Sequence, residues 1–181
     1  MTKISLSGQE KSIEFILSWY EDQVEAINDF KKKVISSILH PSSSSIVNKK
    51  FTAFTINEIN SYFDDSKSEL KHLVCFNLIS ATEAFLRADY NRRVEKKEKT
   101  KIGRLFKEID KNMGVKVSLE EDIIEAWKSV KKKTPFSDFL GLLKYRHWLA
   151  HGRYWTPKFG RNYSFDIAYE IVENVFKVVL K

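Results

Sequence analysis

The sequence predicts an all-α protein, because its composition and its apolar pattern agree. Only six Gly and three Pro occur in 181 residues, which is too few for the many turns of an all-β protein. Several long stretches repeat apolar residues every three to four positions, the period of an amphipathic helix. With 43% apolar residues, the chain can bury a core as one domain, or as one domain with a helical arm.

The amino-terminal part predicts a helix over about residues 8–39, followed by a break. Its apolar stripe comprises Ile13, Ile16, Leu17, Tyr20, Val24, Ile27, Val34 and Leu39. Pro41 and the serines 42–45 end this helix in a polar loop that we expect to be flexible. We therefore interpret residues 1–65 as a helical extension or arm, and residues 66–181 as a helical bundle.

Two helices are predicted between this loop and residue 97. Thr55 and Glu58 have the spacing of a capping box, which starts a short helix, and residues 64–68 permit a second start. No Gly or Pro interrupts residues 69–97, so we expect a long central helix there. Its first apolar stripe comprises Leu70, Leu73, Val74, Asn77, Leu78, Ala81, Phe85 and Ala88, and its second comprises Cys75, Ile79, Leu86 and Tyr90. Glu83 lies in the second stripe, between apolar neighbours.

Capping signals predict four further helices. One near residues 101–112 ends before Gly114, and Ser118 with Glu121 opens another that reaches about residue 131. Pro135 suits the first position of the helix that follows. The final helix follows Ser164 and runs to the end of the chain.

The net charge of +7 is concentrated in the second half of the chain. Residues 1–90 carry 10 Lys and Arg against 12 Asp and Glu, whereas residues 91–181 carry 21 against 12. The basic runs at residues 92–104 and 131–133 could attract a polyanion through its phosphates. Lysines also favour helix carboxyl termini, so any one run alone is more often a solvated helix end.

The sequence shows no sign of a membrane or of an oxidising compartment. No apolar run approaches the roughly 20 residues that span a bilayer, and the amino terminus lacks the pattern of a secretion signal. We therefore expect a cytoplasmic protein. The single cysteine, Cys75, excludes an internal disulfide and a multi-thiolate metal site, and we expect a buried structural thiol.

The segment FSDFLGLLKYRHWLAHGRYW, residues 136–155, holds the candidate site. Its expected apolar stripe comprises Phe136, Phe139, Leu140, Leu143, His147 and Ala150. Arg146 and His151 flank this stripe, about 140° apart on an ideal helix, so they cannot contact each other simply as helix neighbours. Both can still converge on a ligand held over the end of the stripe. Gly152 suits the residue after a helix end, which puts His151 in the last turn. A histidine that titrates near neutrality is suited to proton transfer.

Two strings of the sequence resemble a known family. RHWLAH, residues 146–151, resembles the R-polar-x3-H signature of HEPN domains, and LLKYRHWLAHGRYW is most similar to their RiboL-PSP-type members. SATEAFLR, residues 80–87, resembles the acid-containing central helix of these domains, so the resemblance covers roughly residues 68–181. It implies a helical bundle that pairs into a homodimer, with two R-x4-H motifs in one cleft, and metal-independent cleavage of RNA.

The resemblance also implies a role for each residue of the motif. By position, His151 would be the catalytic acid or base, Arg146 would bind and stabilise the phosphate, and His147 would orient them. These residue types suit the reaction, because cleavage through the RNA 2′-hydroxyl needs a proton acceptor, a proton donor and a cation. Glu83 could hold Arg146 or His147, or it could form an i,i+4 surface pair with Arg87.

Residues beside the motif are candidates for binding RNA. We assign this role to Lys144, Arg153, Tyr154 and Trp155. Trp148 and the aromatic members of this set can stack on bases, although such residues also build cores and interfaces.

The sequence thus predicts a metal-independent endoribonuclease that needs no cofactor. The i,i+4 pair His147 and His151 has metal-ligand spacing, but no third ligand is near it in the sequence. Because the family often serves in toxin systems or antiphage defence, an antitoxin or regulatory partner is expected. Two alternatives are a non-catalytic HEPN dimerisation or nucleotide-binding partner and a sequence-independent nucleic-acid binder.

Overall fold

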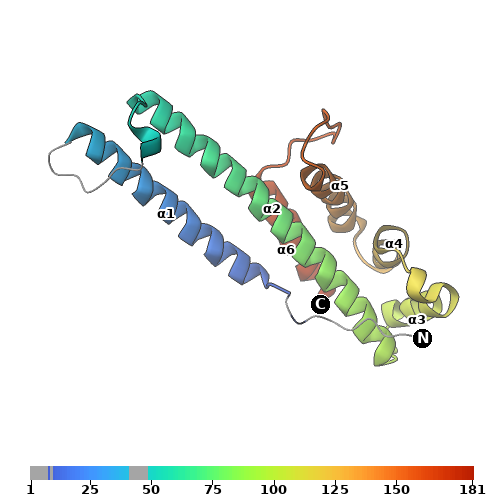
Figure 1. Ribbon diagram of the computed structural model, residues 1–181. Coiled ribbons are helices and arrows are strands. Elements are labelled where there is room, and N and C mark those ends of the chain that lie inside the picture. The colour runs from blue at the N-terminus through green and yellow to red at the C-terminus, as the bar shows by residue number, and fades with distance from the viewer. Residues whose placement is uncertain (1–7, 9, 41–48) are drawn as a thin grey trace. The chain divides into compact units, whose positions relative to one another are not determined.

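The computed structural model describes residues 8, 10–40 and 49–181. Within these residues the protein is all-α, as predicted, with six α-helices and no strand (Figure 1). The helices are α1 (Ile13–Leu39), α2 (Ile56–Glu95), α3 (Lys101–Met113), α4 (Glu125–Val130), α5 (Lys133–Ala150) and α6 (Phe165–Val179). None of the helices in this part of the chain is long and apolar enough to cross a membrane. The expected loop at residues 41–45 lies outside the described residues.

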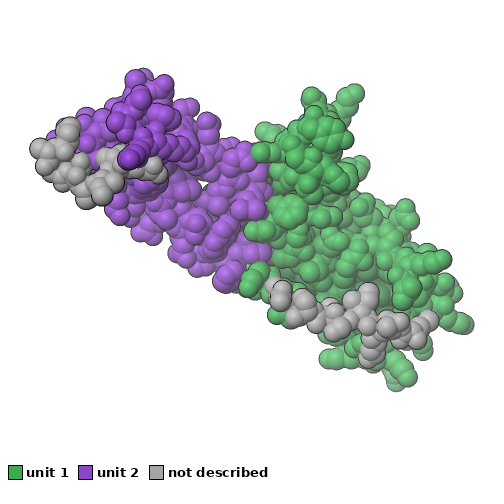
Figure 2. Space-filling model, in the orientation of Figure 1, with its two compact units in different colours: residues 1–12, 75–181 green, residues 13–74 purple. Residues whose placement is uncertain are grey.

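The chain forms two compact units, which Figure 2 shows in different colours. Unit 2 is Ile13–Val74, and unit 1 is Cys75–Lys181 with the residues before Ile13. The boundary between them falls inside α2, whereas the sequence interpretation places a division after residue 65.

Helix α2 is a single helix of 40 residues, so the prediction of two separate helices in this region was wrong. Its predicted capping box is present: the backbone N–H of Thr55 donates to Glu58 Oε2 over 2.7 Å, and the N–H of Glu58 donates to Thr55 Oγ1 over 3.3 Å. Asp64 to Ser68 continue the helix, because no Gly or Pro breaks it between residues 56 and 95.

Unit 2 has its own aromatic core. Phe51 and Phe63 are buried and stack with ring centroids 5.8 Å apart. Tyr62 packs edge-on against both rings, and the Lys50 Nζ lies 3.8 Å from the Tyr62 ring centroid. A hydrogen bond with the Lys50 ammonium lowers the pKa of the Tyr62 hydroxyl. Aromatic packing therefore stabilises this unit around α1 and the start of α2.

Unit 1 packs α5 against α6 and α4. Phe136 of α5 stacks on Trp127 of α4 with centroids 5.8 Å apart, and Phe85 of α2 stacks on Phe176 of α6 at 4.1 Å. The predicted caps are found at both later helix starts: Ser118 Oγ accepts the N–H of Glu121, and Ser164 Oγ accepts that of Ile167.

The helical segment that begins after Ser118 starts differently from its prediction. The carboxylate that returns to the N–H of Ser118 belongs to Asp122, at 2.7 Å, and not to Glu121. The first turn, η4 (Leu119–Ile124), is a π-helical turn that continues directly into α4. π-Helical turns are frequent at functional sites, and this one lies beside the candidate site.

The buried face of α5 also differs from the predicted stripe. Phe136, Phe139 and Leu143 are buried as expected, but Leu142 and Tyr145 are buried with them, while His147 and Ala150 are exposed. Tyr145 takes the inner position because its ring stacks on Trp148 and Tyr163. His147 is thereby left on the surface with the residues that follow it. Pro135 is the third residue of α5 and not the first, a position where its missing N–H still costs nothing.

Candidate functional site

The carboxyl end of α5 presents the motif residues. The helix ends at Ala150; the His151 N–H donates to the carbonyl of His147 over 3.1 Å, and the Gly152 N–H donates to that of Leu149 over 3.3 Å. Gly152 and Arg153 both have positive φ values, 73° and 58°, and the Arg153 N–H donates to Trp148 O over 3.1 Å. Two successive left-handed residues reverse the chain, so that the following loop returns along α5.

Arg146 is held by the predicted carboxylate. Its Nη2 lies 3.4 Å from Glu83 Oε2, while Arg87 Nε and Nη2 each lie 3.3 Å from Glu83 Oε1. Both interpretations of Glu83 therefore occur together, with one oxygen facing each arginine. Arg146 is 32% exposed, and its Nε is buried without an acceptor among the described residues. Its guanidinium keeps hydrogen-bonding capacity that Glu83 does not use.

The two histidines lie side by side next to Trp155. The rings of His147 and His151 are 4.2 Å apart between centroids, and the Trp155 ring lies 6.0 Å from the first and 6.4 Å from the second. Trp148 Nε1 donates to the carbonyl of Trp155 over 2.8 Å. This hydrogen bond fixes the returning loop, and so it sets the position of Trp155 beside the imidazoles.

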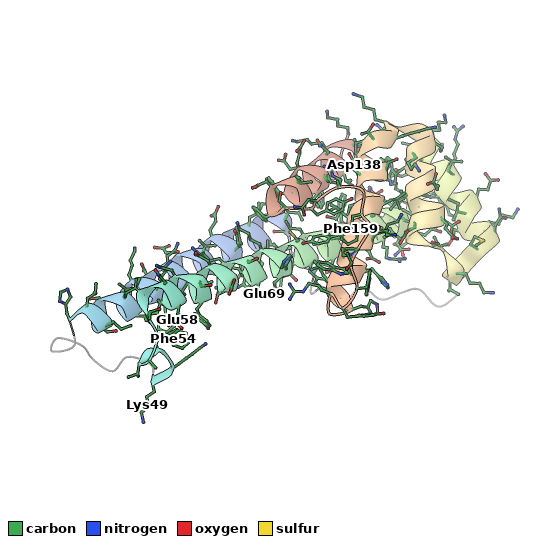
Figure 3. The ribbon with its side chains drawn as sticks, turned by 90° about the horizontal axis from the view of Figure 1, so that it is seen from above. Lys49, Phe54, Glu58, Glu69, Asp138 and Phe159 are labelled. Atoms are coloured by element: carbon green, nitrogen blue, oxygen red, sulfur yellow. The ribbon has the colours of Figure 1, made fainter. Side chains whose placement is uncertain are left out.

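A groove of about 340 Å³ opens beside this end of α5, and we call it the α5 groove. Its walls are basic and apolar, with one carboxylate: Glu120, Leu143, Lys144, Arg146, His147, Trp155, Pro157, Lys158 and Phe159. Phe159 belongs to the loop between α5 and α6, where Figure 3 labels it. His151 does not line the groove; it contacts the His147 ring, which does.

The residues expected to bind RNA divide into two sets. Lys144 and Trp155 line the α5 groove. Tyr154 lies outside it, is 83% exposed and packs edge-on against Trp155, and Arg153 is half-buried at the chain reversal. Trp148 is half-buried, and its indole N–H is bonded to the loop, so its part is to support Trp155.

Sequence reasoning missed the far wall of the groove. Glu120 lies in η4, and Pro157, Lys158 and Phe159 lie in the returning loop. Glu120 has the appearance of an ordinary acidic residue in a first helical turn, so its sequence context contains no functional signal. The basic loop residue Lys158, between Pro157 and Phe159, was the one available hint of a ligand contact.

A buried charge cluster away from the groove was also missed. Asp89, only 5% exposed, accepts from Arg92 Nη2 over 2.5 Å and from Arg93 Nε over 2.7 Å. Glu98 accepts from both arginines, over 2.9 and 2.8 Å. These pairs neutralise the start of the basic run at residues 92–104, which leaves less of it to attract a polyanion.

The described residues contain no group of three or more His, Cys, Asp and Glu side chains that could hold a metal ion. Among these residues, His147 and His151 therefore have no third metal ligand beside them. Comparison with protein-family models, with curated proteins and with solved structures gives no significant match to this chain.

Proposed function

We propose that this protein is a metal-independent endoribonuclease of the HEPN type, with its site at the carboxyl end of α5. The observation that carries the proposal is the gathering of Arg146, anchored by Glu83, with His147 and His151 at the edge of an aromatic and basic groove. The HEPN type is proposed from the resemblance of residues 146–151 to the R-x4-H motif. A role in toxin systems or antiphage defence, with an antitoxin or regulatory partner, rests on that resemblance alone.

The proposed chemistry is attack of an RNA 2′-hydroxyl on the adjacent phosphorus. A base removes the 2′-hydroxyl proton as the new O–P bond forms, and an acid protonates the 5′-oxygen as its bond to phosphorus breaks. His151 performs one of these transfers, and His147 orients it through the contact between their rings. Arg146 donates hydrogen bonds to the phosphorane oxygens as their negative charge grows. Glu83 is a positioning residue that fixes this guanidinium.

The test is incubation of the purified protein with a short single-stranded RNA in excess EDTA. Cleavage should persist, because no step needs a Lewis acid, and the products should carry 2′,3′-cyclic phosphate and 5′-hydroxyl ends. A single 2′-deoxy nucleotide at the cut position should prevent cleavage there while most phosphate contacts survive. Recovery of 5′-phosphate ends, or cleavage of the 2′-deoxy substrate at the same bond, would contradict the proposal.

A second candidate is a nucleic-acid binder that does not cleave. The exposed position of His151, outside the α5 groove, favours it, since a catalytic group must reach the reacting atoms. Binding of single-stranded RNA without any cleavage in the same experiment would support this second function.

A further inference from the structure

The α5 groove contains a carboxylate that the proposed chemistry does not use. Glu120 is an exposed residue of η4, lines the groove and forms no ion pair with any described residue. The same groove carries Lys144, Arg146 and Lys158, yet none of them lies within ion-pair distance of Glu120. A carboxylate repels phosphate, so in a groove that takes RNA it needs a ligand group that supplies N–H donors.

The groove also has the size and the walls that suit a nucleobase. Its volume of about 340 Å³ lies at the small end of ligand pockets, which start at roughly 300 Å³. Trp155 and Phe159 line the groove, and aromatic side chains are the groups on which bases stack, while Lys144 and Lys158 can meet the attached phosphates. Glu120 is then left for the edge of the base.

We propose that the α5 groove is a guanine subsite in which Glu120 accepts hydrogen bonds from the N1–H and the exocyclic N2 amino group. Guanine alone presents two adjacent donors on its Watson–Crick edge. Adenine and cytosine each place an acceptor nitrogen beside one donor, and uracil flanks its N3–H with two carbonyls. A carboxylate, which only accepts, therefore forms two bonds with guanine and is repelled by an acceptor on each other base. The inference rests on the proposed function, because it takes RNA as the ligand.

Binding can be measured without cleavage by using 2′-O-methyl pentanucleotides. The probes are all-uridine except for a central guanosine, adenosine, cytidine or uridine, and fluorescence anisotropy gives the affinity of the full-length protein for each. The guanosine probe should bind about 5- to 150-fold more tightly than the others, the range for one bidentate base contact. A central inosine, which keeps N1–H and lacks the N2 amino group, should fall between guanosine and adenosine.

The variant Glu120→Gln tests the residue itself. Glutamine offers one acceptor and one donor, which match the edges of adenine and cytosine, so preference for guanosine should disappear and affinity for adenosine or cytidine should rise. Glu121→Gln is the matched control, because Glu121 is an exposed neighbour in η4 that does not line the groove. It should keep the preference for guanosine.

Equal affinity for the four probes, or a preference for guanosine that Glu120→Gln leaves unchanged, would overturn the guanine subsite. The two proposals fail separately. Guanosine-selective binding without RNA cleavage would contradict the endoribonuclease and leave the subsite intact. Cleavage without any selectivity in binding would contradict the subsite and leave the endoribonuclease intact.

Discussion

Two arginines share Glu83, but only one of them lines the α5 groove, which makes them a matched pair for mutation. Arg146→Ala should lower the cleavage rate by about 100- to 1000-fold, the usual loss for one donor to a developing oxyanion. Arg87→Ala should leave the rate within a few-fold of wild type, because its exposed pair with Glu83 is worth at most about 1 kcal/mol. Single-turnover cleavage, with circular dichroism to check folding, separates the two. Equal losses would assign Glu83 and both arginines a structural role.

The proposed role of His151 is to transfer a proton in the reaction, and His151 does not line the groove. Its loss should therefore affect chemistry and not binding. For His151→Ala we expect kcat to fall about 100-fold or more, the usual contribution of a general acid or base, with KM nearly unchanged. Steady-state kinetics on a single-cut RNA measures both constants. A rise in KM at constant kcat would instead make His151 a binding residue.

At the scale of the helices, local signals predicted several of the caps. The Thr55–Glu58 capping box is present, and Ser118 and Ser164 each accept the N–H of the residue three positions later, because capping depends on residues three or four apart. The face that each helix buries was harder to predict. Tyr145 is inside and His147 outside because Tyr163, far along the chain, supplies the stacking partner. A period of 3.6 residues contains no information about that partner.

The candidate site likewise contains residues whose proximity the sequence could predict and residues for which it could not. Arg146, His147 and Trp155 come from one short segment, so their proximity could be predicted from spacing and turn residues. Glu120 reaches the groove only through packing of η4 and α4 beside α5, a contact between residues more than 20 positions apart. Asp89 was missed for the opposite reason: its partners are local, but a buried carboxylate at i,i+3 and i,i+4 from arginines has the pattern of a surface ion pair.

Gly141, in the middle of α5, lies close to Tyr163, which belongs to the loop between α5 and α6. Ala at a helix interior normally stabilises by about 1 kcal/mol relative to Gly, but a Cβ here would collide with the Tyr163 hydroxyl. Gly141→Ala should therefore destabilise the protein by about 1–3 kcal/mol, the usual cost of overpacking. Urea denaturation measures the change.

Tyr163→Phe provides the control for this clash. It removes the oxygen, and the next atom, Tyr163 Cζ, is 3.3 Å from the added Cβ. The double variant should thus recover much of the stability lost in Gly141→Ala. Additive losses in the double variant would place the cause elsewhere than the Tyr163 hydroxyl.

At the scale of the whole molecule, three buried acids should make the fold sensitive to alkali. Burial raises the pKa of Cys75 from 9.0 to about 11, and the pKa values of Tyr90 and Tyr145 from 10.0 to about 12. The native state holds these protons more tightly than the unfolded chain. Their contribution to the free energy of unfolding is therefore complete below about pH 9 and is lost as the pH rises toward 11 and 12.

Urea unfolding between pH 7 and 11 measures this loss. Cys75→Ala removes the group that titrates first, so the onset should move from near pH 9 toward pH 10, the ordinary pKa of the tyrosines. A free energy of unfolding that stays constant to pH 11 would contradict the buried, protonated state of these groups.

The last prediction concerns assembly. His147 and His151, at the end of α5, and Tyr154, in the loop that follows, are all exposed. Tyr154 is 83% exposed and packs edge-on against Trp155. Large aromatic side chains at the centre of an interface exclude water from the polar groups beside them. An isologous dimer through this surface would bring two Arg146 and His151 sets together, as the resemblance to HEPN domains implies. We therefore expect a homodimer at micromolar concentration by light scattering, and a specific cleavage activity that falls on dilution as the dimer dissociates. Tyr154→Glu, which places a charge in this interface, should give a folded monomer with little activity. A monomeric wild type with full activity would show that one chain holds the complete site.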